Sequence, residues 1–205
     1  MFGDPVTNPK GWDVYKIKEF AEVRIGPFGS LLHKHDYIAN GIPLINPSHI
    51  IGGKIAPDSL FTISEERAKS LQNYRLQYGD IVLGRRGEIG RCAVVRKGHH
   101  GYLCGTGSMF IRPTEVADAD FIQKTISSPS VAYNLESNAK GITMKNLNSS
   151  IVEEFELPLP DIKAQTHFSS IKHRIEKEID TQKEMLSILD TLFSSLQQRA
   201  FRGEL

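Results

Sequence analysis

The pattern of apolar residues is most regular at the end of the chain, from Leu159 to Leu205. The segment between Pro160 and Gly203 contains neither proline nor glycine, as one long uninterrupted helix requires. Apolar positions alternate in steps of three and four residues, which is the spacing of a coiled-coil seam. They are Phe168, Ile171, Ile175, Met185, Leu189, Leu192 and Leu196. The spacing predicts a helix over 159–205 that pairs with another chain.

A second file of apolar residues runs beside this seam in steps of seven. Its members are Ile179, Leu186, Phe193 and Ala200, so the apolar stripe is wider than a two-stranded coiled coil needs. Glu178 and Gln182 interrupt the seam, and polar seam positions set register and partner choice. A helix of about 40 residues is about 60 Å long, so part of it should project beyond its domain. The alternative is an amphipathic helix lying wholly on that domain.

Residues 1–158 show short segments of strand periodicity between glycine and proline turns. The clearest is Gly79–Leu83, followed by a turn at Gly84–Glu88 and the apolar return Ile89–Val95. Single strands are also predicted within 41–47 and 155–159. Residues 50–55 are predicted to form a tight hairpin, and residues 101–113 two strands.

Helices are predicted over 65–73, 118–126 and 129–140. Ser64 and Ser128 are the expected N-caps of the first and third, and Pro129 suits a first helical position. We therefore expect an α+β protein, with a mixed, β-rich globular domain over 1–158 followed by one long helix over 159–205.

Composition places the chain among ordinary folded proteins. Of its 205 residues, 40% are hydrophobic and 24% are charged, and no run approaches a transmembrane helix. The first residues lack the basic and apolar regions of a signal peptide, so we expect a cytoplasmic protein. Cys92 and Cys104 are then expected to be reduced.

The net charge of +1 conceals an uneven distribution. Eight basic residues lie between Arg67 and Lys97, against only Asp80 and Glu88. This distribution predicts a domain with one basic face, which would suit a partner as acidic as DNA. A solvated charged surface is the alternative.

Motifs of catalysis are absent from the sequence. It contains no Walker loop, dinucleotide fingerprint, zincin motif or nucleophile elbow. Asn46–His49 matches the Asn-Pro-Pro-aromatic motif of amino methyltransferases only weakly. Two cysteines and two histidines, Cys92, His99, His100 and Cys104, lack the paired spacing of a structural zinc site. We expect no enzymatic activity, no metal and no cofactor in this chain.

Several segments together resemble one half of the specificity subunit of type I restriction-modification systems. They are Gly79–Leu83 with Arg86–Gly90, Gly141–Thr143 with Leu147, Leu157–Pro160 reaching Gln165, and Gln198–Leu205. The resemblance covers nearly the whole chain. It implies a target recognition domain followed by a conserved helix.

The resemblance also implies partners. In that family, two recognition domains held apart by antiparallel helices each bind one half of a bipartite DNA sequence. The subunit docks methyltransferase subunits, which carry S-adenosylmethionine, and through them the restriction subunits. Because this chain shows one domain and one helix, we expect a homodimer that binds a symmetric bipartite site.

Loop chemistry suggests where double-stranded DNA would be contacted. The candidates lie in the glycine-rich bend, at the hairpin tip and in the polar loop after residue 140. They are Ser30, Lys34, His35, Arg85, Arg86, Thr143, Lys145 and Asn146. The bend at Gly26–Ser30 could instead be a plain structural turn without a phosphate contact. Arg85 and Arg86 could instead belong to a turn that only keeps the protein soluble.

Two questions stay open at this point. An oligomerising coiled-coil adaptor without DNA specificity is the alternative function. The opening Phe2–Pro5 resembles the linker that follows the first helix of full-length relatives, so the chain is either a half-subunit or the second half of a larger one.

Overall fold

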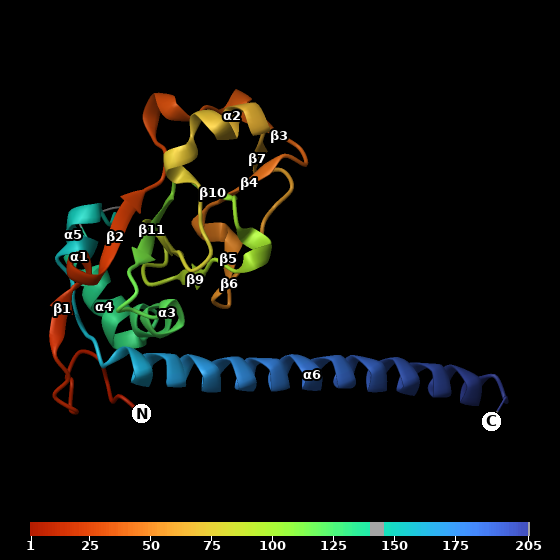
Figure 1. Ribbon diagram of the computed structural model, residues 1–205. Coiled ribbons are helices and arrows are strands. Elements are labelled where there is room, and N and C mark those ends of the chain that lie inside the picture. Colours follow the sequence, from red (N-terminus) through yellow and green to blue (C-terminus); the bar gives the residue numbers. More distant parts are fainter. Residues whose placement is uncertain (140–145, 205) are drawn as a thin grey trace. The chain divides into compact units, whose positions relative to one another are not determined.

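The computed structural model describes residues 1–139 and 146–204 and confirms the expected α+β class. Two compact units divide the chain, one over Met1–Gln165 and one from Thr166 onward. The first contains all strands of the described residues (Figure 1). The second consists mainly of one helix.

A four-stranded antiparallel sheet forms the centre of the first unit, in the order β2-β11-β8-β9. Its strands are β2 (Ala21–Ile25), β11 (Ser108–Pro113), β8 (Ile81–Gly84) and β9 (Cys92–Val94). β8 and β9 are the predicted hairpin at Gly79–Val95, which is confirmed. All four residues of β8 are buried, because both faces of this strand are covered.

A smaller four-stranded sheet has the order β10-β4-β7-β3, with β10 parallel to β4 and the other pairs antiparallel. Its strands are β10 (Leu103–Cys104), β4 (Ile42–Ile45), β7 (Thr62–Ile63) and β3 (Tyr37–Ile38). The helix α2 (Glu65–Ser70) follows β7 (Figure 1). The predicted hairpin over 50–55 is confirmed as β5 (Ile50–Ile51) and β6 (Lys54–Ile55).

Four further α-helices lie among the described residues of this unit, and each of them contacts the central sheet or another of the four (Figure 1). They are α1 (Ile17–Phe20), α3 (Ala119–Ile126), α4 (Pro129–Asn138) and α5 (Ser149–Glu153). α3 packs on β9, α5 packs on β2, and α4 lies between α3 and α5. Sequence analysis did not predict α5, which is a single short turn of helix capped by Asn148.

The N-caps of the helices were predicted with mixed success. The Ser64 hydroxyl accepts a hydrogen bond from the Arg67 amide at 3.1 Å, as expected for a cap. Ser128 occupies the N-cap position of α4, as predicted, but its hydroxyl makes no capping hydrogen bond and donates instead to the carbonyl of Thr125 at 2.7 Å. Pro129 does occupy the first position of α4.

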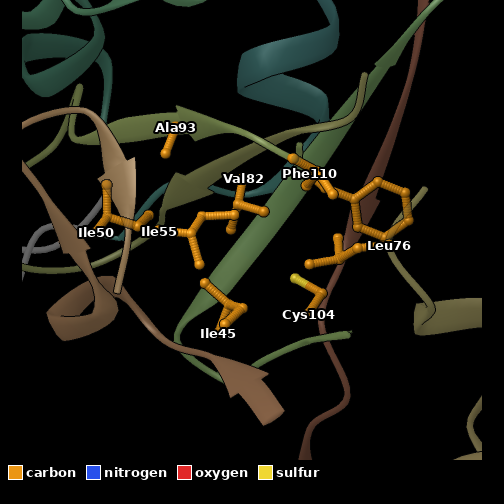
Figure 2. Packing of buried hydrophobic residues seen from close by; sticks show 9 residues of the cluster. Ile45, Ile50, Ile55, Leu76, Val82, Ala93, Cys104 and Phe110 are labelled. Carbon is orange, nitrogen blue, oxygen red and sulfur yellow. The ribbon is translucent and has the colours of Figure 1, made fainter. Parts of the chain in front are cut away.

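Apolar side chains from both sheets meet in the core between them. Figure 2 shows Ile50 and Ile55 of the β5–β6 hairpin directed toward Val82 of the central sheet. The remaining buried members of this cluster are Ile45, Leu76, Ala93, Val95, Cys104 and Phe110. The central sheet is therefore fixed on this face by apolar packing.

The basic segment forms less of a free cationic face than predicted, because many of its arginines form ion pairs with carboxylates. Arg75 pairs with Glu65, Arg91 with Glu88, and Arg96 with Asp120. Arg67 pairs with Asp36 at 3.2 Å. Outside this basic segment, Arg112 holds Asp80, whose side chain is 1% exposed, through two hydrogen bonds of 2.7 Å. Much of the basic segment therefore stabilises the fold rather than forming a free cationic surface.

Two strands from opposite ends of the first unit, β1 (Val14–Lys16) and β12 (Glu156–Pro158), pair in an antiparallel two-stranded sheet. Gln165 is completely buried here. Its side-chain oxygen accepts from the Asp118 amide at 2.8 Å, and its amide group donates to the Pro160 carbonyl at 2.7 Å. The first turn of the long helix is thus fixed to the preceding loop.

The long helix α6 runs over Ile162–Phe201, slightly inside the predicted range. Gly203 follows the end of the helix, and its φ of 70° allows the Glu204 amide to donate to the Arg199 carbonyl at 2.9 Å. From Ile175 to Leu196 the large apolar side chains of both predicted files are 40% to 69% exposed. No helix among the described residues is long and apolar enough to span a membrane.

Candidate nucleic-acid interface

Several loops meet at one edge of the central sheet. β2 and β8 end at this edge, while β11 and β9 begin there, because the strands alternate in direction. We call the segments at this edge the loop edge. They are Gly26–Gly29, Arg85–Arg91, Gly105–Gly107 and Asn146–Leu147. Segments that are 120 residues apart in the sequence, Gly26 and Asn146, thus belong to one surface.

The loop edge is held by unusually close backbone packing. The Gly26 amide donates to the Ser108 carbonyl at 3.0 Å. A Cβ on Gly26 would lie 2.0 Å from the Gly105 carbonyl oxygen, and a Cβ on Gly105 would lie 2.3 Å from Oδ1 of Asn46. No side chain fits at either position, so the bend at Gly26–Gly29 lies directly against the turn at Gly105–Gly107.

Arg85 connects the sheet to the segment after the undescribed residues. Its amide donates to the Gly107 carbonyl at 3.0 Å, and its Nε donates to the Leu147 carbonyl at 3.0 Å. Burial, and then the neighbouring charge of Arg86, lower the pKa of Arg85. The Nε–H of this guanidinium is therefore directed toward the protein.

Arg86 and Asn146 lie side by side through an antiparallel backbone bridge. Arg86 is exposed, and among the residues that the structure describes no carboxylate pairs with it. The Oδ1 atom of Asn146 is buried and has no hydrogen-bond partner within the described ranges. The structure thus brings together two residues that sequence analysis proposed from separate loops.

Lys34 and His35 lie in a different setting. They form a 3-10 turn with Asp36, which accepts from the His33 amide at 2.7 Å and pairs with Arg67 of α2. The His33 hydrogen bond is the main cause that lowers the pKa of Asp36. In the part of the chain with described coordinates, no hydrogen bond or ring contact joins this turn to Arg86 or Asn146.

The other sequence candidates are not placed. Thr143 and Lys145 lie outside the described residues, and so does the side chain of Ser30. Sequence analysis did not select Phe28, an exposed aromatic residue of the loop edge, because an exposed apolar side chain has no distinctive sequence signal.

The two cysteines are free and buried. Burial raises the pKa of the Cys92 thiol to about 12 and that of the Cys104 thiol further, so both are protonated at neutral pH. Within residues 1–139 and 146–204, no group of three His, Cys, Asp or Glu side chains could hold a metal ion.

Comparisons with known proteins agree on one family. The family described as "Type I restriction modification DNA specificity domain" matches residues 9–200. The specificity subunit of the type I restriction enzyme MjaIX of Methanocaldococcus jannaschii is 25% identical over 195 residues, 94% of this chain and 44% of the relative. The EcoBI specificity subunit of Escherichia coli is 26% identical over 177 residues, which are 83% of this chain and 37% of the relative.

Solved structures show the same fold. A chain of a type I R-M system, from a structure describing complex assembly and conformational transition, has a TM-score of 0.63 at 16% identity, covering 96% of this chain and 47% of that one. The HsdS subunit of Thermoanaerobacter tengcongensis has a TM-score of 0.57 at 16% identity, with coverages of 96% and 46%.

The fold is therefore that of type I specificity subunits, and the chain belongs to the type I restriction-modification DNA specificity family. This confirms the resemblance found in the sequence. The chain spans less than half the length of the relatives that it matches.

The close approach at Gly26 gives a first testable prediction. Gly26→Ala should lower the free energy of unfolding by about 1–3 kcal/mol, since the added methyl group collides with the Gly105 carbonyl. Chemical denaturation measures this change. Gly98→Ala is the matched control, because nothing lies within 4 Å of its added Cβ. Equal stability of the two variants would show that the bends can separate at no cost.

Proposed function

We propose that this chain is a DNA-binding specificity component that recognises one half of a bipartite duplex target. The observation that carries the proposal is the loop edge, where Arg86 and Asn146 adjoin on a rigid sheet in a domain of this family. Loops on a rigid scaffold are the usual carriers of recognition residues.

The two side chains suit complementary tasks. An exposed arginine can contact phosphate oxygens or the O6 and N7 acceptors of guanine, and an asparagine amide can pair with adenine. The Oδ1 atom of Asn146 is buried without a donor among the described residues, so contact with a base requires this side chain to rotate toward the solvent. Arg85 has a supporting role, since it is bonded to Leu147.

The long helix acts as a spacer and as a docking element. Its exposed apolar stripe supports a homodimer in which two copies of α6 pair antiparallel. Because 40 residues of helix extend about 60 Å, such a pair would hold two recognition domains about one turn of duplex or more apart.

Further subunits would supply the chemistry. We propose that methyltransferase subunits, which carry S-adenosylmethionine, dock on this chain and link it to the restriction subunits. The chain itself would be non-catalytic. A cytoplasmic location stays a prediction.

Selection from a random duplex library tests this function. The full chain is combined with its cognate methyltransferase subunit, and the methylated duplexes are sequenced. Two inverted half-sites separated by a spacer are expected, because two identical domains related by a two-fold axis bind inverted sequences. Unequal halves would mean that a different recognition domain stands beside this one. No motif would contradict DNA specificity and favour the adaptor.

Arg86→Ala should weaken binding to the selected duplex by more than about twofold and make its salt dependence shallower, since one cationic contact is lost. Titration at several salt concentrations measures both quantities. Lys97→Ala is the matched control, because this exposed lysine follows β9 at the opposite edge of the sheet. Unchanged affinity of Arg86→Ala would remove that arginine from the site.

The double variant Leu189→Glu and Leu192→Glu should convert the dimer to a monomer. Two buried carboxylates on each helix would oppose pairing. Light scattering at micromolar concentration measures the mass. The control is Ser187→Glu with Ser194→Glu, which adds the same charge on the side of the helix away from the seam. A wild-type monomer, or a double Leu variant with unchanged mass and melting, would contradict the pairing.

A further inference from the structure

Phe28 is an exposed aromatic residue within an otherwise anchored loop. Its side chain is 64% exposed, whereas the preceding Gly26 and Pro27 are buried. Leu32, which follows four residues later, packs in the core of the smaller sheet. Single exposed apolar side chains are common, so exposure alone carries no inference.

The loop that carries Phe28 is fixed on both sides. Before it, the Gly26 amide is bonded to the Ser108 carbonyl at 3.0 Å. After it, the chain turns through the 3-10 turn Gly29–Leu31, and the Leu31 carbonyl accepts from Nη2 of Arg67 at 2.6 Å. Phe28 itself has extended backbone angles, with φ −143° and ψ 167°. The ring is thus exposed by a fixed backbone rather than by a free end.

The position of this loop decides what the ring could contact. Gly26 adjoins Ser108 and Gly105, and Arg85 is bonded to Gly107, so the bend and the hairpin tip belong to one edge. A phenylalanine ring cannot bind phosphate. Because an exposed arginine at the same edge of the sheet can bind phosphate, the ring is suited to an apolar part of the same ligand.

We propose that Phe28 is a specificity-determining residue that packs on the C5-methyl group of a thymine in the half-site. This inference rests on the proposed function. Among the groups that bases expose in the major groove, this methyl is the apolar one, and phenylalanine is among the side chains that contact it. The contact adds sequence preference without adding charge, so it complements the phosphate contact proposed for Arg86.

The test compares methylation profiles of the wild-type chain and Phe28→Ala, each with the cognate methyltransferase subunit and the same random duplex library. Phe28→Ala should lose a thymine preference at one position and keep the rest of the motif. Replacing that thymine by deoxyuridine in one fixed duplex should weaken the wild type about fourfold, which corresponds to one buried methyl group. It should leave Phe28→Ala unchanged.

Phe28→Lys provides a second variant that does not depend on apolar contact. It should lose the same thymine preference while binding a scrambled duplex at least as tightly as the wild type, since a cation is added. Tyr78→Ala is the matched control, because Tyr78 is 60% exposed and precedes β8 at the opposite edge of the sheet.

The outcomes separate this inference from the function beneath it. A wild-type chain without any motif would overturn the proposed function. A wild-type motif retained in Phe28→Ala, or weakened equally at all positions, would overturn only the role of Phe28. Equal loss on deoxyuridine in wild type and variant would overturn the thymine contact.

Discussion

The close approach of two backbone segments, at Gly26 and Gly105, is the constraint on which the loop edge depends. Because neither position has room for a Cβ, the bend after β2 can lie directly on the turn before β11. This contact sets where the chain leaves the sheet and therefore where Phe28 is exposed. On the other side of β11, the bonds of Arg85 to Gly107 and Leu147 extend the same edge.

The sequence predicted the elements of this edge but not their assembly. Alternation around Gly79–Val95 was enough for the hairpin, and the proline-free seam was enough for α6, because both signals are local. The pairing of Arg86 with Asn146 depends on strand order, which periodicity does not contain. α5 was missed because five residues cover little more than one helical turn, which is too short for an apolar pattern to repeat. The sequence placed Ser128 correctly at the N-cap of α4, but it could not show that the hydroxyl donates to the Thr125 carbonyl instead of accepting from an amide of the helix.

Charge in this domain has two distinct uses. Asp80 has 1% exposure, and without Arg112 it would be a buried charge, so that pair is part of the fold. Arg75, Arg91 and Arg96 also have carboxylate partners. Counting cations along the sequence therefore overestimates the surface available to DNA. What distinguishes Arg86 is its exposure at the loop edge, not its membership of a basic segment.

The polar residues in the seam of α6 constrain how two copies could pair. Glu178 and Gln182 lie near the middle of the helix, and the Gln182 amide donates to Glu178 Oε1 at 2.8 Å. In the proposed antiparallel pair, a two-fold axis near Asp180 would place each Glu178 opposite the Gln182 of the other copy. A shifted register would place these polar groups against leucine or isoleucine, at the cost of burying them without partners. In the proposed dimer, the interruption of the seam would thus favour one register, and that register would fix the distance between the two recognition domains.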